Sequence, residues 1–404
     1  MNQMQKAVTR GVPVRRLKGV VLALLLGVGA GSVQADQTFT MGSDSSLSLG
    51  FGVRTSYTNL QYGAPNGSSA SNNFNVDDFR LYVSGQMNKV IGGTFNTERD
   101  SAGNIVLMDG ITRFEFTPDF NVWAGRLLPP SDRSNLDGPF YLNVWSYPLV
   151  SMYPSVAIGR DNGAVIWGKP MGGKIVYSVG AFGGHNDTAG ESDNSGDLLY
   201  AGRVVFNFLD PEPAPAYYNA STYYGAKDIL SLGLVWQYQQ NGVGNSPSSA
   251  GDYSSGNLDL LFEKKLANSD VVTIEGAYYH YGLGAVDCGS GEPGSQPCVN
   301  TASGNSDFGG LVDGHAYLAT LEYMFGEKFG PAGFEGQWQP FVRYQELDRT
   351  LSGTTDKQTD VGVNYVINGF NAKLSAVYSK LEDNRMIAPL NNVNQFIVGF
   401  QYQY

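Results

Sequence analysis

Charged side chains occur on the polar face of many strand-like stretches, in which every second residue is polar and the residues between them are apolar. Charges placed in this way can line a water-filled passage and select the ions and polar solutes that cross it. Most of the bases fall on the first and last stretches and most of the acids between them, so we expect a field across the passage that orients dipolar solutes. The alternative is local neutralisation, with Asp109 and Glu115 beside Arg113, and Asp360 beside Lys373. The bases expected to point inward are Arg54, Arg80, Arg113, Arg203, Arg343 and Lys373, and the acids are Asp109, Glu115, Asp259, Glu263, Glu275, Glu322 and Asp360.

The apolar residues that alternate with polar ones are clearest in the last stretch of the sequence. Phe396, Val398, Phe400, Tyr402 and Tyr404 share one face, whereas glutamine and glycine dominate the other. A period of two residues indicates a β-strand with one apolar face. On a free edge strand this face would promote aggregation in water, but it suits a strand that closes a barrel and faces lipid.

Stretches with this period run from one end of the sequence to the other and predict an all-β fold, a transmembrane antiparallel β-barrel of about 16 strands. Short and long connections alternate, as expected for short periplasmic turns and long external loops. The connection at 209–228 is an exception, because it is long for a periplasmic turn. A β-sandwich or a propeller is the soluble alternative, and a propeller would repeat every ~40–50 residues. The stretches are centred near residues 52, 82, 94, 111, 122, 165, 178, 203, 234, 259, 275, 319, 342, 362, 374 and 399, and the short turns lie at 88–89, 117–120, 169–173 and 368–369.

The turn at 368–369 has the sequence Asn-Gly, which favours a two-residue hairpin turn. Such a turn fixes which residues of the two flanking strands face each other. A slip of one residue would turn the apolar side chains to the wrong face, so the alternation supports this register. The predicted register places Tyr365 opposite Ala372, Val363 opposite Leu374, Val361 opposite Ala376 and Thr359 opposite Tyr378.

The N-terminal residues have the composition of an export signal. A basic stretch with Lys6 and Arg10 precedes the apolar run at 19–30, and Ala35 ends a small-residue cleavage motif. We therefore expect residues 1–35 to be a signal peptide and residues 36–404 to form a single domain. The whole chain already carries a net charge of −11, and losing this segment removes only basic residues, which argues against a nucleic-acid partner. A mean hydropathy of −0.20 excludes a helical membrane protein.

Few residues could support redox, metal or hydrolytic chemistry. Cys288 and Cys298 share one Gly/Pro/Ser-rich segment and are expected to form a disulfide in an oxidising compartment, with two free thiols as the alternative. No haem-attachment motif occurs, and we expect no cofactor and no metal site. A hydrolase would need a nucleophile with a base, commonly histidine. His185, His280 and His315 show no such context.

Four blocks of the sequence resemble the phosphate-selective porin O/P family of Gram-negative outer membranes. They are LMDGITRFEFTPDFNVWAGRLLPPSDRSNL at 107–136, RDNGAVIWG at 160–168, AGRVVFNF at 201–208 and DVGVNYVINGFNAKLSAVYS at 360–379. The resemblance implies a sixteen-stranded trimeric porin whose third external loop folds inward. The partners expected of such a porin are outer-membrane lipid and lipopolysaccharide.

The connection at 127–163 is the candidate for that loop. It is rich in proline and aromatic residues, which suits a segment folded into the lumen as a constriction better than one in solvent. A packed surface lid is the alternative. The charged residues that it could present to a permeating solute are Asp132, Arg133, Asp137, Arg160 and Asp161.

These patterns predict a channel for passive diffusion of small hydrophilic solutes or inorganic ions, with anions such as phosphate among them. A phosphate site needs several converging bases, for which Arg126, Arg133 and Arg160 are close enough in sequence. The absence of lysine from 127–163 and the acidic overall charge speak against it. An outer-membrane hydrolase and a plugged structural or adhesion barrel are the alternatives.

Overall fold

The computed structural model describes residues 37–99, 103–154, 158–184, 196–243, 251–284, 311–386 and 388–404. The chain divides into two compact units, Met1–Gly31 and Ser32–Tyr404, and only the second contains described residues. The predicted signal peptide and both cysteines therefore lie outside the described residues. The strands are β1 (Gln37–Thr40), β2 (Ser46–Leu60), β3 (Ser71–Gln86), β4 (Ile91–Arg99), β5 (Ile105–Thr117), β6 (Phe120–Leu127), β7 (Asp161–Gly168), β8 (Ile175–Phe182), β9 (Leu199–Asn207), β10 (Ile229–Val243), β11 (Gly251–Lys265), β12 (Val271–Gly282), β13 (Gly314–Met324), β14 (Gln337–Arg349), β15 (Thr354–Asn368), β16 (Ala372–Asp383) and β17 (Asn392–Gln403), with a helix α1 (Arg133–Asp137) and a 3₁₀ turn η1 (Met171–Gly173).

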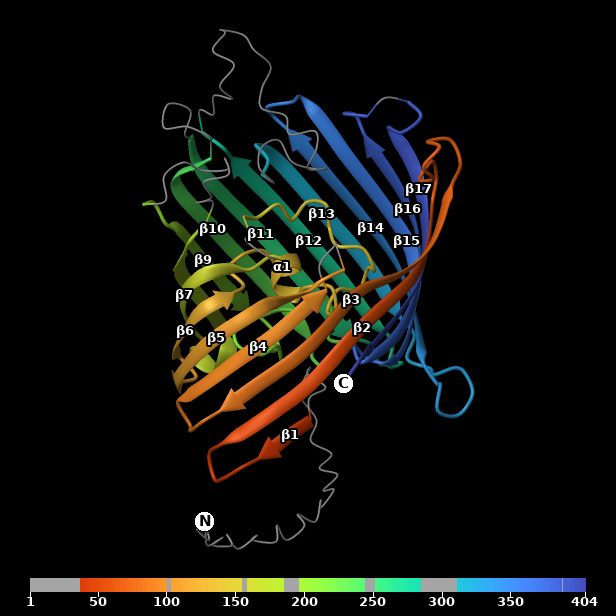
Figure 1. Ribbon diagram of the computed structural model, residues 1–404. Coiled ribbons are helices and arrows are strands. Elements are labelled where there is room, and N and C mark those ends of the chain that lie inside the picture. Colours follow the sequence, from red (N-terminus) through yellow and green to blue (C-terminus); the bar gives the residue numbers. More distant parts are fainter. Residues whose placement is uncertain are drawn as a thin grey trace, which may run out of the picture. The chain divides into compact units, whose positions relative to one another are not determined.

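Strands β2 to β17 form a closed antiparallel barrel of sixteen strands, each paired with its neighbours in sequence (Figure 1). Pairing of β17 with β2, from Gln395 opposite Leu60 to Gln403 opposite Gly52, closes the ring. All sixteen predicted strands are present at the predicted places, so the predicted fold class is confirmed. The additional strand β1 was not predicted. It pairs with the first residues of β2, at the part of that strand's edge that β17 does not reach.

The alternation of side chains separates the two faces of the barrel wall. On β17, Phe400 is 39% exposed and Val398 42%, whereas Gln401 is fully buried and Gln403 is 3% exposed. Apolar side chains therefore cover the outside and polar ones point inward, as predicted. Among the described residues, no helix is both long enough and apolar enough to cross a membrane.

The hairpin of β15 and β16 differs from its predicted register by two residues. Tyr365 lies opposite Leu374 and Val361 opposite Tyr378, so the predicted partners were wrong, although a shift of two keeps every side chain on its predicted face. The connection is longer than two residues because Phe370 turns into the barrel, and the Asn371 amide donates to the Asn368 carbonyl at 2.9 Å. The Phe370 ring packs between those of Tyr141 and Tyr224, with centroid distances of 5.1 and 4.8 Å.

A positive charge on the outer face should destabilise the barrel according to its depth in the bilayer. Val398 is central on β17, so we expect Val398→Arg to lower the free energy of unfolding by about 2–4 kcal/mol. Tyr404→Arg, just beyond the end of the same strand, should cost no more than ~1 kcal/mol. Denaturant unfolding in lipid vesicles measures both, and equal costs would contradict the outward assignment of this face.

Candidate functional site

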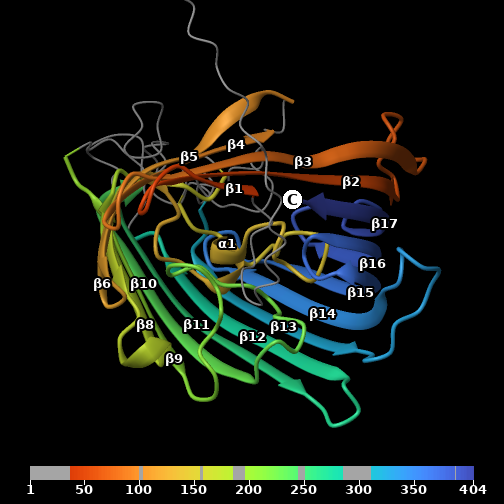
Figure 2. The ribbon, with the colours of Figure 1, turned by 90° about the horizontal axis from the view of Figure 1, so that it is seen from below.

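The connection between β6 and β7 runs inside the barrel. Figure 2, a view from below, shows its helix α1 enclosed by the ring of strands. Asp132 begins this helix, because its side chain accepts a hydrogen bond from the Asn135 amide at 3.1 Å, and Gly138 ends it with a φ of 63°. The Asp132 carboxylate also accepts from the Tyr279 hydroxyl on β12 at 2.8 Å. Burial raises the pKa of Asp132 to about 6, and these hydrogen bonds oppose the rise.

Cations on the barrel wall hold this connection through its backbone carbonyls. The Arg54 guanidinium donates to the Trp145 carbonyl at 2.6 Å and packs over the Trp145 ring, 4.0 Å from its centroid. A carbonyl buried without a donor costs roughly 1–3 kcal/mol, so these contacts stabilise the irregular chain inside the barrel. The other wall cations that act in this way are Arg343 on the Ser146 carbonyl (2.9 Å), Arg203 on the Ser131 carbonyl (3.2 Å) and Lys373 on the Leu142 carbonyl.

Two glycines of the wall allow the connection to pack closely against the barrel. A Cβ atom on Gly52 of β2 would lie 2.7 Å from the Phe140 ring, and one on Gly399 of β17 would lie 2.6 Å from the Trp145 ring. Both distances are shorter than carbon atoms tolerate. The two aromatic rings therefore rest on bare backbone of the strands that close the barrel.

Segment 208–228, between β9 and β10, also enters the barrel. The Tyr217 side chain is 2% exposed, and its hydroxyl donates to the Leu128 carbonyl at 2.7 Å. Ser221 contacts the other inward connection twice, through its hydroxyl to Asp137 at 2.9 Å and its amide to the Tyr141 carbonyl at 3.1 Å. The unusual length of this turn has its explanation here, because it packs against the connection that follows β6.

Arg133 joins the two inward segments. Its guanidinium is 1% exposed and binds both Glu212 oxygens at 2.8 Å, while it also donates to the Ala220 carbonyl at 3.0 Å and the Ser231 hydroxyl at 2.9 Å. Burial alone would raise the pKa of Glu212, but the charge and hydrogen bonds of Arg133 lower it to about 2. The pair is therefore ionised at neutral pH.

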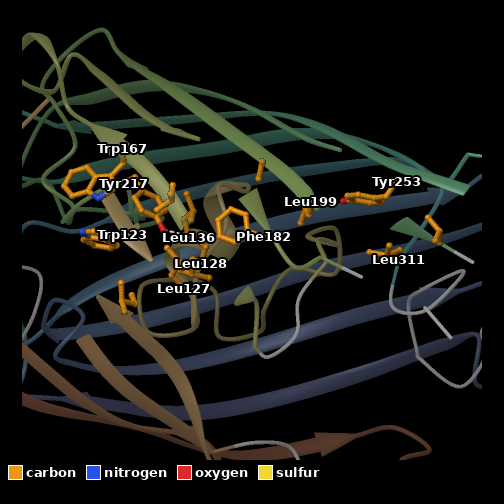
Figure 3. Close-up of a cluster of buried hydrophobic side chains, with 14 of the residues drawn as sticks. Trp123, Leu127, Leu128, Leu136, Trp167, Phe182, Leu199, Tyr217, Tyr253 and Leu311 are labelled. Atoms are coloured by element: carbon orange, nitrogen blue, oxygen red, sulfur yellow. Dashed lines mark hydrogen bonds between the residues drawn. The ribbon is translucent and has the colours of Figure 1, made fainter. Parts of the chain in front are cut away.

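Apolar packing between the wall and the two segments completes this arrangement. Figure 3 shows Trp123 and Trp167 of the wall beside Tyr217 and Leu128. The Trp123 ring centroid lies 5.4 Å from that of Trp167 and 5.7 Å from that of Tyr217, distances typical of favourable edge and tilted contacts. This cluster fixes the segments against β6 and β7.

A partly open cavity of about 190 Å³ remains between the inward segments and strands β3 to β6. Its wall side is polar, with Arg80, Arg113 and Asp109, whereas its other side is largely apolar. The charged residues that line it are Arg80, Asp109, Arg113, Glu115, Asp137 and Arg160, and the other lining residues include Tyr82, Met108, Trp123, Leu136, Tyr141, Ala214, Pro215, Tyr218 and Asn219.

All the wall arginines predicted to point inward have a carboxylate partner, which favours the alternative to a field across the lumen, although Asp109 pairs with Arg160 and not with Arg113. Arg160 contacts Asp109 at 3.0 Å and Arg113 contacts Glu115 at 3.5 Å. Asp360 pairs with Arg343 at 2.8 Å, and not with Lys373 as that alternative proposed. The remaining pairs are Arg54 with Asp78 at 2.6 Å, Arg80 with Glu98, and Arg203 with Asp259 at 2.8 Å.

Most of the predicted pore-lining residues are turned inward without lining the main cavity. Glu263 accepts from the amides of Tyr223 and Gly225 at 2.9 and 2.8 Å, and so anchors segment 208–228. Glu275 and Glu322 line a much smaller cavity. Arg54, Arg203, Asp259, Arg343 and Lys373 likewise bind the inward segments. Asp132 and Arg133 belong to one of these segments, and Asp161 accepts from the Gly184 amide at 2.7 Å.

Arg126 does not line the lumen, so that prediction was wrong. Trp123 and Leu127 on the same strand are buried inside, so the alternation puts Arg126 on the outer face. Its side chain donates there to the exposed Asn162 at 3.1 Å. His280 and His315 also lie on the outer face, next to each other on β12 and β13, and His185 is outside the described residues.

The cavity also contains residues that were not predicted, among them Tyr82, Trp123 and Tyr218. The signal for Tyr218 was present in the sequence, because a periplasmic turn of this length with four tyrosines is unusual. Within the part of the chain that the structure describes, no group of three or more His, Cys, Asp or Glu residues is placed to hold a metal ion.

Comparison with solved structures identifies the fold. OmpF of Salmonella typhi, in complex with daunomycin, superposes with a TM-score of 0.56 at 12% identity, covering 91% of this chain and 100% of that one. The anion-selective porin from Comamonas acidovorans gives 0.55 at 13% identity, covering 89% and 100%. The trimer form of OmpT from Vibrio cholerae gives 0.51 at 10% identity, covering 90% and 100%.

The chain has the fold of the outer-membrane porins. A barrel of this kind points to the outer membrane of a Gram-negative bacterium. No protein-family model matches the sequence, and no curated protein matches it. The phosphate-selective O/P family is therefore not established by these comparisons.

Removing the Arg133 side chain should leave Glu212 as a buried charge without its partner. We expect Arg133→Ala to lower the free energy of unfolding by roughly 3–5 kcal/mol. The double variant Arg133→Met with Glu212→Leu, which removes both charges, should recover most of the loss. Denaturant unfolding in detergent micelles tests this. A double variant whose loss of unfolding free energy equals the sum of the two single losses would contradict direct coupling.

The same pair should make stability depend on pH in the acid range. The folded pKa of Glu212, about 2, is below its ordinary value of 4.5, so its contribution is complete above pH 4.5 and is lost as the pH falls through about 2. Wild type should therefore lose more stability than Glu212→Gln between pH 4.5 and 2. Thermal unfolding at a series of pH values measures the difference, and parallel curves would argue against it.

Proposed function

We propose that the chain is a porin that allows passive diffusion of small hydrophilic solutes and inorganic ions across the outer membrane. A barrel of sixteen strands is wide enough to hold water. The observation that carries the proposal is the partly open, charge-lined cavity left beside the two inward segments. In this proposal the connection 127–163 is the constriction loop, and the cavity beside it is the narrowest part of the path.

The charges of the cavity favour weak ion selectivity. Three arginines and three carboxylates line it, and Arg113 and Arg160 each have a carboxylate partner within 4.0 Å. A channel for anions such as phosphate is the second candidate, supported by Arg80, Arg113 and Arg160 in one cavity and by the four sequence blocks that resemble the O/P family. Competition between phosphate and chloride conductance distinguishes the two.

We propose that the chain is not an enzyme. His280 and His315 are exposed on the outer face, away from the cavity, which does not suit a hydrolase. A plugged structural or adhesion barrel is a stronger rival, because the two inward segments fill much of the lumen. Conductance in planar bilayers separates this rival from a porin, and lipase and protease assays test the hydrolase.

The assembly and processing of the chain are part of the proposal. Removal of residues 1–35 as a signal peptide would leave a single domain, 36–404, with a disulfide between Cys288 and Cys298. The apolar outer face would contact lipid, with lipopolysaccharide at the external rim. A homotrimer is supported by the trimer form of one similar structure.

We expect the wild-type protein to form open channels in planar bilayers with a cation-to-anion permeability ratio near one. Arg113→Gln and Arg80→Gln remove charges that line the cavity and should raise this ratio roughly two- to threefold. Lys357→Gln is the matched control, because Lys357 lies on the outer face of β15 and does not line the cavity, and it should leave the ratio unchanged. Reversal potentials in a salt gradient measure all three, and an unchanged ratio in both Arg113→Gln and Arg80→Gln would place the path elsewhere.

A further inference from the structure

Segment 208–228 supplies the apolar side of the cavity that was described above. Pro215, Ala216 and Tyr218 line the cavity from this segment, opposite Arg113 and Asp109 of β5. The passage that we propose for solutes therefore runs between a charged wall and an apolar one. The segment enters from the end of the barrel where the short turns lie, and the connection after β6 starts from the other end.

Contacts at three places keep the segment inside the barrel. The Lys169 ammonium donates to the Ala214 carbonyl at 2.6 Å, and Glu212 binds Arg133. Near the other end of the segment, the Glu263 carboxylate accepts hydrogen bonds from the backbone amides of Tyr223 and Gly225. The segment is thus held near both ends, and Tyr217 and Ser221 hold it between them. A segment held in this way is a fixed part of the lumen and is suited to define an aperture.

The charged wall presents bases and acids side by side. Arg160 and Asp109 are 3.0 Å apart, and Arg113 and Glu115 are 3.5 Å apart. A solute with one charge would be attracted by one member of each pair and repelled by the other. A zwitterion can lie antiparallel to such a pair, with its carboxylate toward the arginine and its ammonium toward the acid. An apolar side chain on the same solute would then face Tyr218 and Pro215.

We infer that segment 208–228 is a second constriction element, and that its apolar surface opposite the paired charges makes the passage favour zwitterions with an apolar side chain, such as phenylalanine. This inference rests on the proposed porin function. It assigns to one turn of the barrel both a narrowing of the path and a preference among solutes of the same net charge.

The pairing of the flanking strands allows the segment to be removed, together with Arg133→Met so that no buried cation loses its Glu212 partner. The Asp210 amide donates to the Asp228 carbonyl at 2.9 Å, so the pairing of β9 with β10 continues to these residues. Replacing 211–227 by Asn-Gly joins them by a two-residue turn. The matched control replaces 330–335 by Asn-Gly, since Phe329 and Gly336 are paired and the turn between them is exposed at the same end of the barrel. Heat-dependent gel migration verifies that both variants fold.

Ion conductance and liposome swelling together test the inference. In wild type, phenylalanine should enter liposomes at least as fast as serine, although serine is smaller. The variant without 211–227 should conduct roughly twofold more potassium chloride or better, because current follows the width of the constriction. The same variant should admit serine faster than phenylalanine, whereas the control should behave as wild type.

Point variants keep the test decisive if the shortened barrel does not fold. Tyr218→Ala should raise conductance and lower the phenylalanine-to-serine ratio, whereas Tyr200→Ala, on the outer face, should change neither. Serine entering wild type faster than phenylalanine, or unchanged values in Tyr218→Ala, would overturn the inference. A wild type that does not conduct would instead refute the porin function itself.

Discussion

The structure depends on one constraint, which is that backbone amides and carbonyls in hydrocarbon must be hydrogen-bonded within the protein. The pairing of β17 with β2 satisfies it by removing the free edges of the sheet, and the Tyr404 and Phe51 amides donate to each other's carbonyls at 2.8 and 2.7 Å. Strand β1 extends this pairing along the rest of the β2 edge. Once the sheet is closed, the alternation of side chains fixes which residues meet lipid and which are enclosed.

Closure creates a second requirement inside the barrel. Sixteen strands enclose more space than their own side chains fill, and two irregular segments occupy part of it. Their carbonyls need donors, which the wall supplies from residues such as Arg54, Arg343 and Lys373. The inward charges thus have two uses: most of them hold chain in place, and only a minority, including Arg80 and Arg113, border the remaining cavity.

The fold could be predicted from sequence because a period of two is a local property, visible in stretches such as 396–404. Inward placement followed from the same parity for residues such as Asp259 and Glu322. Arg126 was assigned from its proximity to a loop and not from parity, which explains that error. The register of β15 and β16 depended on where Phe370 packs, and this is a contact with residues distant in sequence.

The use of the inward residues was harder to predict for the same reason. Whether Arg133 faces water or Glu212 is decided by the path of a segment that begins 75 residues later, at 208. Sequence patterns indicated that 209–228 was too long for a simple turn, but they contain no information about the direction in which it folds. The alternation of side chains between two faces holds only for strands. For the irregular chain at 127–163, the sequence therefore identified the charged residues but not the direction in which each one points.

The glycines under Phe140 and Trp145 have a consequence for how the bore of such a barrel can change. The rings sit at their present depth only because Gly52 and Gly399 have no side chain beneath them. A single methyl group at either position would push the loop away from β2 and β17, with no change in charge. A glycine-to-alanine change in the wall would therefore alter the diameter of the bore. It would do so without changing the ionic contacts that govern which solutes are attracted.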